Sequence, residues 1–320
     1  MMRKAIGVDF GGTSVKPGVV VGGEIVEFAE RIPTRKHEGA EALLGAVVRA
    51  VEELRAKHPD VCALGAGLPG MVDSVNGVVR ELSNVPGWRD VCLTKLLEDR
   101  TGLPVAIDND ANAMTYAEWR YGAGRDGVNV VCVTLGTGVG GGLILDGQLF
   151  RGSQLGAGEI GQMSIDPRGV PGHYGNFGAL EKYVGNVQIG ERGRQLYREA
   201  GLTKSEEECT PIALQDAADQ GDAIAQMVWE EIGFHLGTTL CDIVWLLNPD
   251  RIVIGGGIAR AGEYVFGPIR QIVRERTMKI FHEKLEIVPA ALGNDAGIIG
   301  SAALGLAKAG PEIAAPIISA

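Results

Sequence analysis

Short apolar runs separated by pairs of glycine mark the beginning of the chain. Residues 4–33, KAIGVDFGGTSVKPGVVVGGEIVEFAERIP, contain three β-branched segments interrupted by Gly11-Gly12 and Gly22-Gly23. A β-branched run bounded by glycine is typical of a strand that ends in a turn. The pattern therefore predicts three successive strands joined by two tight turns.

A helical period follows this strand-rich start. In residues 38–58, EGAEALLGAVVRAVEELRAKH, one set of apolar positions recurs at three- and four-residue spacing, which predicts a helix with one apolar face. These positions are Leu43, Leu44, Val47, Val48, Val51 and Leu54. Further strands are predicted within VCALGAGLPGMVD (61–73) and LPVAIDND (103–110), and a helix within residues 111–121, closed by Gly122.

The stretch VTLGTGVGGGLILDGQLF, residues 133–150, carries the G-x-G-x-x-G spacing at Gly136, Gly138 and Gly141. A dinucleotide-binding fingerprint must lead from a strand through the glycines into a helix. Here the glycines lead into a second apolar strand and a turn at Asp146-Gly147. We therefore predict a hairpin and reject the nicotinamide interpretation.

This hairpin and the N-terminal one share a plan of strand, small-residue turn with a threonine, and strand. The similarity suggests two related halves. Glycine-rich turns let backbone amides converge on an anion, so each turn is a candidate phosphate site. A third cluster, within DRIVIGGGIARAGEYV (250–265), leads from strand to helix; it could accept an anion or a purine ring, or use glycine for geometry alone.

Composition narrows the class of protein. The chain has 320 residues, 45% of them hydrophobic and 22% charged, with a formal net charge of −10. The length favours two domains, and the acidic balance argues against nucleic-acid and anionic-membrane partners. No apolar run is long enough for a membrane span or a signal peptide, and the five scattered cysteines lack a C-x-x-C pair. We expect a cytoplasmic protein with reduced thiols.

Five motifs together resemble the ROK family of bacterial sugar kinases and sugar-responsive repressors. They are DFGGTSVK (9–16), NDANA (109–113), LGTGVGGGLI (135–144), GAGEIG (156–161) and IGGGI (254–258). The resemblance implies a two-domain α/β fold of the actin/hexokinase-like (ribonuclease H-like) class, with ATP and sugar meeting in a cleft. It places a small domain at residues 1–117 plus 298–320 and a large domain at 118–297. ROK kinases are commonly homodimers or homotetramers.

Asp110 is the candidate catalytic residue, because phosphoryl transfer needs a group that receives the proton of the sugar hydroxyl. It follows the apolar strand LPVAI, and the alternative role is to cap the next helix. The resemblance implies that Asn109 binds sugar hydroxyls. Asn84 and the backbone around Gly70 are weaker sugar-contact candidates, and Asn84 is equally well explained as a turn residue.

ATP and Mg²⁺ are the implied cofactors, with polyphosphate as the open alternative donor. Asp9 repels phosphate, so its expected role is to orient Mg²⁺ through water. Lys16 is either a phosphate contact or a solvated strand residue. The remaining nucleotide-binding candidates are Gly11, Gly12, Thr13, Thr137, Gly138, Gly256 and Gly257.

Glu159 lies in a glycine-rich loop, where hydrogen bonding to sugar hydroxyls explains it better than a surface charge. Glu181 matches another sugar ligand of the family, although a glutamate in a first helical turn is also favoured by the helix dipole. Gln162 occupies the position at which the family has a histidine that contacts both sugar and zinc. Glutamine donates and accepts hydrogen bonds but carries no charge, which leaves the preferred hexose open.

Many ROK proteins hold a structural zinc ion in this region, and here the four ligand positions are Gln162, Gly172, Tyr174 and Ala179. None offers a thiolate or an imidazole, so we expect no structural zinc. His173 is expected to be a solvent-exposed loop residue. Our hypothesis is that Tyr174 and Phe177 pack where the metal would stand.

The resemblance favours an ATP-dependent glucokinase that forms glucose 6-phosphate. Fructose, mannose, allose and N-acetylhexosamines are the alternative substrates, because hexoses differ in one or two groups. A repressor of the family places a helix-turn-helix domain before the first phosphate motif, whereas Asp9 lies eight residues after Met1. A non-catalytic sugar-binding regulator is opposed by the presence of Asp9, Asp110 and both glycine turns.

Overall fold

The computed structural model of the protein describes residues 2–34, 39–82 and 87–310. The chain divides into two units. Unit 1 holds the described residues of Met1–Arg125, Arg151–Gly156 and Leu292–Ala320, and unit 2 holds Asp126–Phe150 and Ala157–Ala291. The domain boundaries drawn from the sequence stay a prediction.

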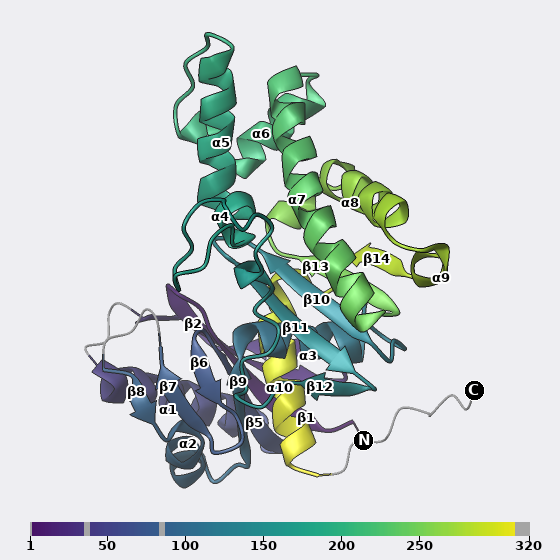
Figure 1. Ribbon diagram of the computed structural model, residues 1–320. Helices are drawn as coiled ribbons and strands as arrows, with labels where there is room; N and C mark the ends of the chain where they lie inside the picture. Colours follow the sequence, from purple (N-terminus) through teal and green to yellow (C-terminus); the bar gives the residue numbers. More distant parts are fainter. Residues whose placement is uncertain (1, 35–38, 83–86, 311–320) are drawn as a thin grey trace. The chain divides into compact units, whose positions relative to one another are not determined.

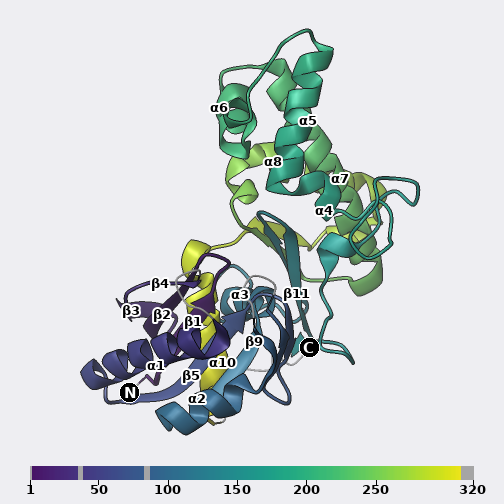
Figure 2. The same cartoon turned by 90° about the vertical axis from the view of Figure 1, so that its left-hand side faces the viewer.

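Unit 1 is built on a mixed sheet of order β3-β2-β1-β5-β9, with β4 paired to β2 (β1, β2, β5 and β9 are labelled in Figure 1, β3 and β4 in Figure 2). The first strands form antiparallel hairpins, as the alternation of apolar runs and glycine pairs predicts, and β5 and β9 continue the sheet in parallel with β1. A small antiparallel sheet, β6-β7-β8, follows β5. The strands are β1 (Lys4–Phe10), β2 (Ser14–Val21), β3 (Glu24–Phe28), β4 (Ile32–Pro33), β5 (Val61–Leu68), β6 (Met71–Asp73), β7 (Val78–Glu81), β8 (Arg89–Val91) and β9 (Val105–Asn109).

Helices cover both faces of the unit 1 sheet (Figure 2). One face packs against α1 (Gly39–Lys57) and α2 (Leu93–Thr101), and the other against α3 (Asp110–Tyr121) and α10 (Ala296–Lys308), which follows the short 3-10 helix η5 (Gly293–Asp295). The six apolar positions predicted for one face of α1 are all buried. Gly7 and Gly65 let α10 touch the sheet backbone: a Cβ there would lie 1.9 Å from the Ile298 carbonyl oxygen and 1.7 Å from that of Ser301.

Unit 2 repeats the strand plan of unit 1. Its sheet has the order β12-β11-β10-β13-β14, an antiparallel meander followed by two parallel strands. The G-x-G-x-x-G segment forms the hairpin of β10 and β11, in which Leu135 pairs with Val139, so the predicted hairpin is confirmed. The strands are β10 (Val130–Leu135), β11 (Val139–Leu145), β12 (Gln148–Phe150), β13 (Arg251–Gly255) and β14 (Glu286–Pro289).

The helices of unit 2 form one apolar core with this sheet, in which α7 packs along α8. They are α4 (Glu181–Val184), α5 (Asn186–Glu199), α6 (Pro211–Asp219), α7 (Ala223–Leu247), α8 (Glu263–Arg276) and α9 (Lys279–His282), with the 3-10 helices η2 (Ile160–Gln162), η3 (Glu207–Cys209) and η4 (Ile258–Ala261). In the part of the chain that the structure describes, none of the helices combines the length and apolar character that crossing a membrane requires.

Candidate functional site

Several candidate site residues of unit 1 lie at one edge of the sheet, where three parallel strands have their carboxyl ends. Asp9 on β1 pairs with Gly67 on β5, which pairs with Asp108 on β9. Gly70 follows β5, and Asp110 follows β9. Ligand sites of open α/β sheets form at such edges, so the edge is suited to a binding site.

Asn109 and Asp110 lie at the beginning of α3. The Asn109 side chain is the N-cap: its Oδ1 accepts from the amides of Ala111 (2.9 Å) and Asn112 (3.4 Å). Its Nδ2 donates to the Gly70 carbonyl oxygen at 3.1 Å, which joins these two sugar-contact candidates. Asp110 is the first helical residue and is half-buried; the N-cap position belongs to Asn109, while Asp110 Oδ1 accepts from the first-turn amide of Ala111 at 2.9 Å.

Two buried carboxylates of β9 and α3, the elements that carry these residues, are missing from the candidates drawn from the sequence. Asp108 directly precedes Asn109 and is paired with Arg151, and Glu118 lies near the end of α3. A charged residue inside the apolar strand 105–109 is a signal that could have singled out Asp108. No comparable local pattern marks Arg151 or Glu118.

The first glycine turn leaves its tip open to ligands. Gly11 donates to the Ser14 carbonyl oxygen (3.0 Å), which closes the turn, and Gly12 and Thr13 at the tip are exposed. Asp9 accepts from Lys16 Nζ at 2.9 Å, across the pairing of β1 with β2. Lys16 is therefore an ion-paired residue, which corrects the alternative of a merely solvated lysine.

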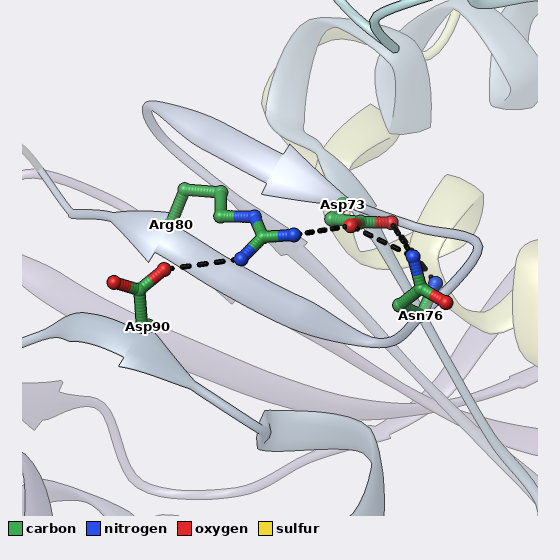
Figure 3. Close-up of polar contacts among 4 residues, drawn as sticks. All are labelled: Asp73, Asn76, Arg80 and Asp90. Atoms are coloured by element: carbon green, nitrogen blue, oxygen red, sulfur yellow. Dashed lines mark hydrogen bonds and ion pairs between the residues drawn. The ribbon is translucent and has the colours of Figure 1, made fainter.

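The β6-β7-β8 sheet follows Gly70, and a cluster of polar side chains links its three strands (Figure 3). Arg80 on β7 donates to Asp73 on β6 (2.8 Å) and to Asp90 on β8 (3.2 Å), and Asp73 also accepts from the backbone and side chain of Asn76. The hydrogen bonds from Asn76, followed by that from Arg80, hold the pKa of Asp73 below its usual value. Asn84, between β7 and β8, lies outside the described residues.

In unit 2, the ends of the neighbouring strands β10 and β13 bring the other glycine clusters to one sheet edge. The turn after β10 closes with a hydrogen bond from Gly136 to the Gly138 carbonyl oxygen (3.0 Å) and leaves Thr137 exposed. After β13, Gly256 has a φ of 90°, and a Cβ there would lie 2.1 Å from the Leu135 carbonyl oxygen. The next residue, Gly257, faces open space.

The unit 2 sugar-contact candidates lie beside this edge. Glu181 accepts from the Val139 amide at 3.0 Å, at the end of the glycine turn. Glu159 is exposed at the surface but partly desolvated, and this desolvation, followed by the negative charge of Glu181, raises its pKa. The buried Oε1 of Gln162 has no hydrogen-bond partner among the described residues. A buried hydrogen-bond acceptor without a protein partner is expected to accept a hydrogen bond from a ligand or a water molecule.

The loop of residues 162–179 is closed by hydrogen bonds. Asn176 Nδ2 donates to the Gln162 carbonyl oxygen (3.1 Å), and the Gly172 amide donates to that of Asn176 (2.7 Å). Tyr174 is 82% exposed and Phe177 49% exposed, so the hypothesis that they pack in place of a metal is wrong. These short contacts instead bring the loop backbone together at Asn176.

The residues at the four zinc-ligand positions do not fit a zinc ion. Gly172 and Ala179 have no side-chain donor atom, Tyr174 is exposed, and Gln162 has a neutral amide. His173 lies 3.0 Å from Lys182 Nζ and 3.8 Å from Glu181, and its side chain is 60% exposed, as expected for a loop residue. Structural zinc sites use thiolates and imidazoles, so one histidine beside a lysine is an insufficient donor set.

Comparison with known proteins assigns the chain to a family. Residues 5–308 match the ROK family. The chain belongs to the ROK family. The glucokinase of Halalkalibacterium halodurans is 36% identical over 310 residues, which cover 93% of this chain and 93% of that protein. The DNA-binding transcriptional dual regulator NagC of Escherichia coli is 31% identical over 271 residues, 83% of this chain and 66% of that protein.

Solved ROK structures share the fold. The crystal structure of a ROK family glucokinase from Streptomyces griseus, in complex with glucose and AMPPNP, matches with a TM-score of 0.76 and 32% identity, over 95% of this chain and 99% of that chain. The predicted α/β fold of the actin/hexokinase-like class is confirmed. The family therefore includes both sugar kinases and regulators that are similar to this chain over most of its length.

Proposed function

We propose that the protein is an ATP-dependent hexokinase that phosphorylates the 6-hydroxyl of glucose. Its similarity to glucokinases, at 36% and 32% identity, supports this proposal. The observation that carries it is the position of Asp110. This half-buried carboxylate begins α3 at the carboxyl edge of the parallel strands, beside Asn109 and Gly70.

In the proposed reaction, Asp110 accepts the proton of the 6-hydroxyl as the hydroxyl oxygen bonds to the γ-phosphorus of ATP. The bond between that phosphorus and the bridging oxygen of ADP breaks. The amides of Gly12, Thr13 and Thr137 would bind phosphate oxygens, because tip residues of glycine turns present N–H groups to anions. Asp9 would orient Mg²⁺ through water, and the ion supplies neutralisation of phosphate charge.

Hexose recognition is assigned to polar groups that fix the orientation of the hydroxyls: Gly70, Asn84, Asn109, Asp110, Glu159, Gln162 and Glu181. The exposed tips of the two glycine turns and the open space beside Gly257 support the assignment of nucleotide binding to the following residues: Gly11, Gly12, Thr13, Lys16, Thr137, Gly138, Gly256 and Gly257. Zinc is not part of the proposal, because the donor set around Gln162 lacks thiolates.

The first test is the variant Asp110→Asn, which keeps the size of the side chain and removes its basicity. A general base contributes about 10²–10⁴-fold, so kcat should fall by that factor while glucose affinity, measured by calorimetry, stays close to that of the parent protein. Asp99→Asn, an exposed position on α2, is the matched control and should keep parental kcat. An Asp110→Asn protein with parental kcat would refute the assigned role.

Substrate choice is tested with glucose, fructose, mannose, allose and N-acetylglucosamine, each assayed with ATP and Mg²⁺. We expect the highest kcat/KM for glucose. The second candidate, a non-catalytic sugar-binding regulator, is favoured by the similarity to NagC. It predicts hexose binding without formation of ADP for any sugar of the panel.

A further inference from the structure

The chain passes between the two units at four positions: 125/126, 150/151, 156/157 and 291/292. Residues next to three of these positions are bound by carboxylates of β9 and α3. All the contacts described below lie within unit 1. The same strand and helix carry Asn109 and Asp110, so the continuous β9–α3 segment holds the proposed proton acceptor and also binds residues at three of the four connections.

Glu118 binds two of these ends. Its Oε2 accepts from the amide of Ala123 and its Oε1 from the amide of Leu292, each at 2.8 Å. Ala123 lies two residues before the first connection, and Leu292 is the first residue after the last one. A Cβ at Gly122 would lie 2.1 Å from Glu118 Oε2, so this glycine leaves the space that the carboxylate occupies.

Asp108 binds the third end. Its Oδ2 accepts from Nε of Arg151, the first residue after the second connection, at 2.7 Å. The other oxygen of Asp108 accepts from the amide of Asn109 (2.8 Å) and from Nδ2 of Asn112 (2.9 Å). One carboxylate therefore joins a connecting segment to the residues on both sides of Asp110.

Both carboxylates are nearly inaccessible to solvent, with Asp108 2% and Glu118 3% exposed. Burial of an ionised carboxylate is costly unless hydrogen bonds or an opposite charge compensate it. Part of this compensation comes from residues at the connections, through Arg151 for Asp108 and through Ala123 and Leu292 for Glu118, so a shift of a connection would disturb the carboxylate. Asp110 lies two residues from Asp108 and on the same helix as Glu118, and would shift with them.

We propose that Glu118 and the Asp108–Arg151 pair are positioning residues for Asp110, coupling the connecting segments to the proton acceptor. This inference rests on the proposed function. A displacement of about 1 Å at a reacting group can cost about 10²-fold in rate. We call Glu118 and the Asp108–Arg151 pair the two anchors. Weakening the hydrogen bonds of either anchor should therefore slow phosphoryl transfer without removing any group that touches the hexose or ATP.

The test uses Glu118→Gln, which replaces one acceptor oxygen by an N–H donor, and Arg151→Lys, which keeps the charge and loses the guanidinium fork. The same changes at exposed positions of α1, Glu52→Gln and Arg49→Lys, are the matched controls. Melting temperatures are measured first, and kcat is then measured well below each of them. We expect kcat to fall by roughly 10- to 100-fold in both anchor variants, with a much smaller change in hexose affinity, and no fall in the controls.

A double-mutant cycle separates positioning from a merely structural role. If the anchors act through Asp110, adding either substitution to Asp110→Asn should cause little further loss of kcat. Parental kcat in the anchor variants below their melting temperatures, or an undiminished loss in the Asp110→Asn background, would overturn the proposal.

Hydrogen exchange distinguishes failure of this inference from failure of the proposed function. The amides of Ala111 and Asn112 should exchange faster in both anchor variants than in the controls, whether or not the protein phosphorylates a sugar. If the parent protein has no kinase activity, the proposed function fails and this measurement alone decides the anchoring. Unchanged exchange at both amides would contradict it.

Discussion

At the scale of single residues, the negative charge of Glu181 opposes the ionisation of Glu159. Partial desolvation and the charge of Glu181 raise the pKa of Glu159, so its proton is retained to a higher pH in the folded protein than in the unfolded chain. The associated stabilisation is complete below the unfolded-state pKa and is lost as the pH rises through the folded-state value. Hydroxyl donors of a bound hexose would compensate the ionised carboxylate.

This pair predicts how hexose affinity depends on pH. A protonated Glu159 accepts hydroxyl donors less well, so affinity should fall as the pH falls through the raised pKa. In Glu181→Gln the opposing charge is gone, so the pKa of Glu159 drops. The fall of hexose affinity on the acid side of the pH curve, its acid limb, should therefore move to lower pH. Calorimetric titration between about pH 4 and 8 measures the position of this limb, which is independent of the overall affinity.

Glu199→Gln is the control for this prediction, because Glu199 is an exposed residue near the end of α5. Its acid limb should coincide with that of the parent protein. An acid limb that stays in place in Glu181→Gln, or that moves equally in Glu199→Gln, would contradict the pairing of Glu159 with Glu181.

The sequence predicted residue types better than residue partners. The acid after an apolar strand and the glycines of the turns are local patterns, and they led to Asp110, Asp9 and the two turns proposed to bind phosphate. Which of two adjacent polar residues caps α3 depends on side-chain rotamers, and the structure selects Asn109. The partner of Asp108 is 43 residues away and that of Glu118 is 174 residues away, so no local pattern reveals them.

At the scale of an element, the turn from β13 to η4 uses adjacent glycines for different purposes. Gly256 has a φ of 90° and lies against the backbone of Leu135, whereas Gly257 has a helical φ of −62° with nothing near its missing side chain. The first glycine is required by the path of the chain. The second leaves open space that a ligand could occupy. The run Gly255-Gly256-Gly257 in the sequence does not reveal this difference between the two glycines.

Alanine at each position should separate the two roles. Gly256→Ala should lower the free energy of unfolding by more than about 2 kcal/mol, because a left-handed conformation and a backbone clash coincide. Gly257→Ala should leave stability within about 1 kcal/mol and raise KM for ATP, since the added methyl occupies the open face. Denaturant unfolding and ATP kinetics check both. Equal stability of the two variants would contradict the structural role of Gly256.

At the scale of the whole molecule, the two sheets follow one plan. The orders β3-β2-β1-β5-β9 and β12-β11-β10-β13-β14 correspond strand by strand, which confirms the two related halves suggested by the glycine turns. Residues 151–156 group with unit 1, and within them Arg151 pairs with Asp108, which lies 43 residues earlier in the chain, so no local pattern reveals this grouping. The homodimer or homotetramer and the cytoplasmic location stay predictions.

The net charge of the molecule bears on the choice between kinase and regulator. The E. coli relative NagC is a DNA-binding regulator, and the chain is 31% identical to it. Sequence-independent DNA binding depends on lysine and arginine contacts to phosphates and gives dissociation constants of about 10⁻⁴–10⁻⁶ M at physiological salt. A chain of net charge −10 is repelled by that polyanion.

We therefore expect no binding of random-sequence duplex DNA tighter than about 10⁻⁴ M, measured by fluorescence anisotropy at physiological salt. Lowering the salt should not create binding, because weaker screening strengthens repulsion between like charges. A basic DNA-binding protein titrated into the same duplex is the positive control. A micromolar dissociation constant that weakens as salt is added would mean that a local cationic surface outweighs the net charge, and would favour the regulator over the kinase.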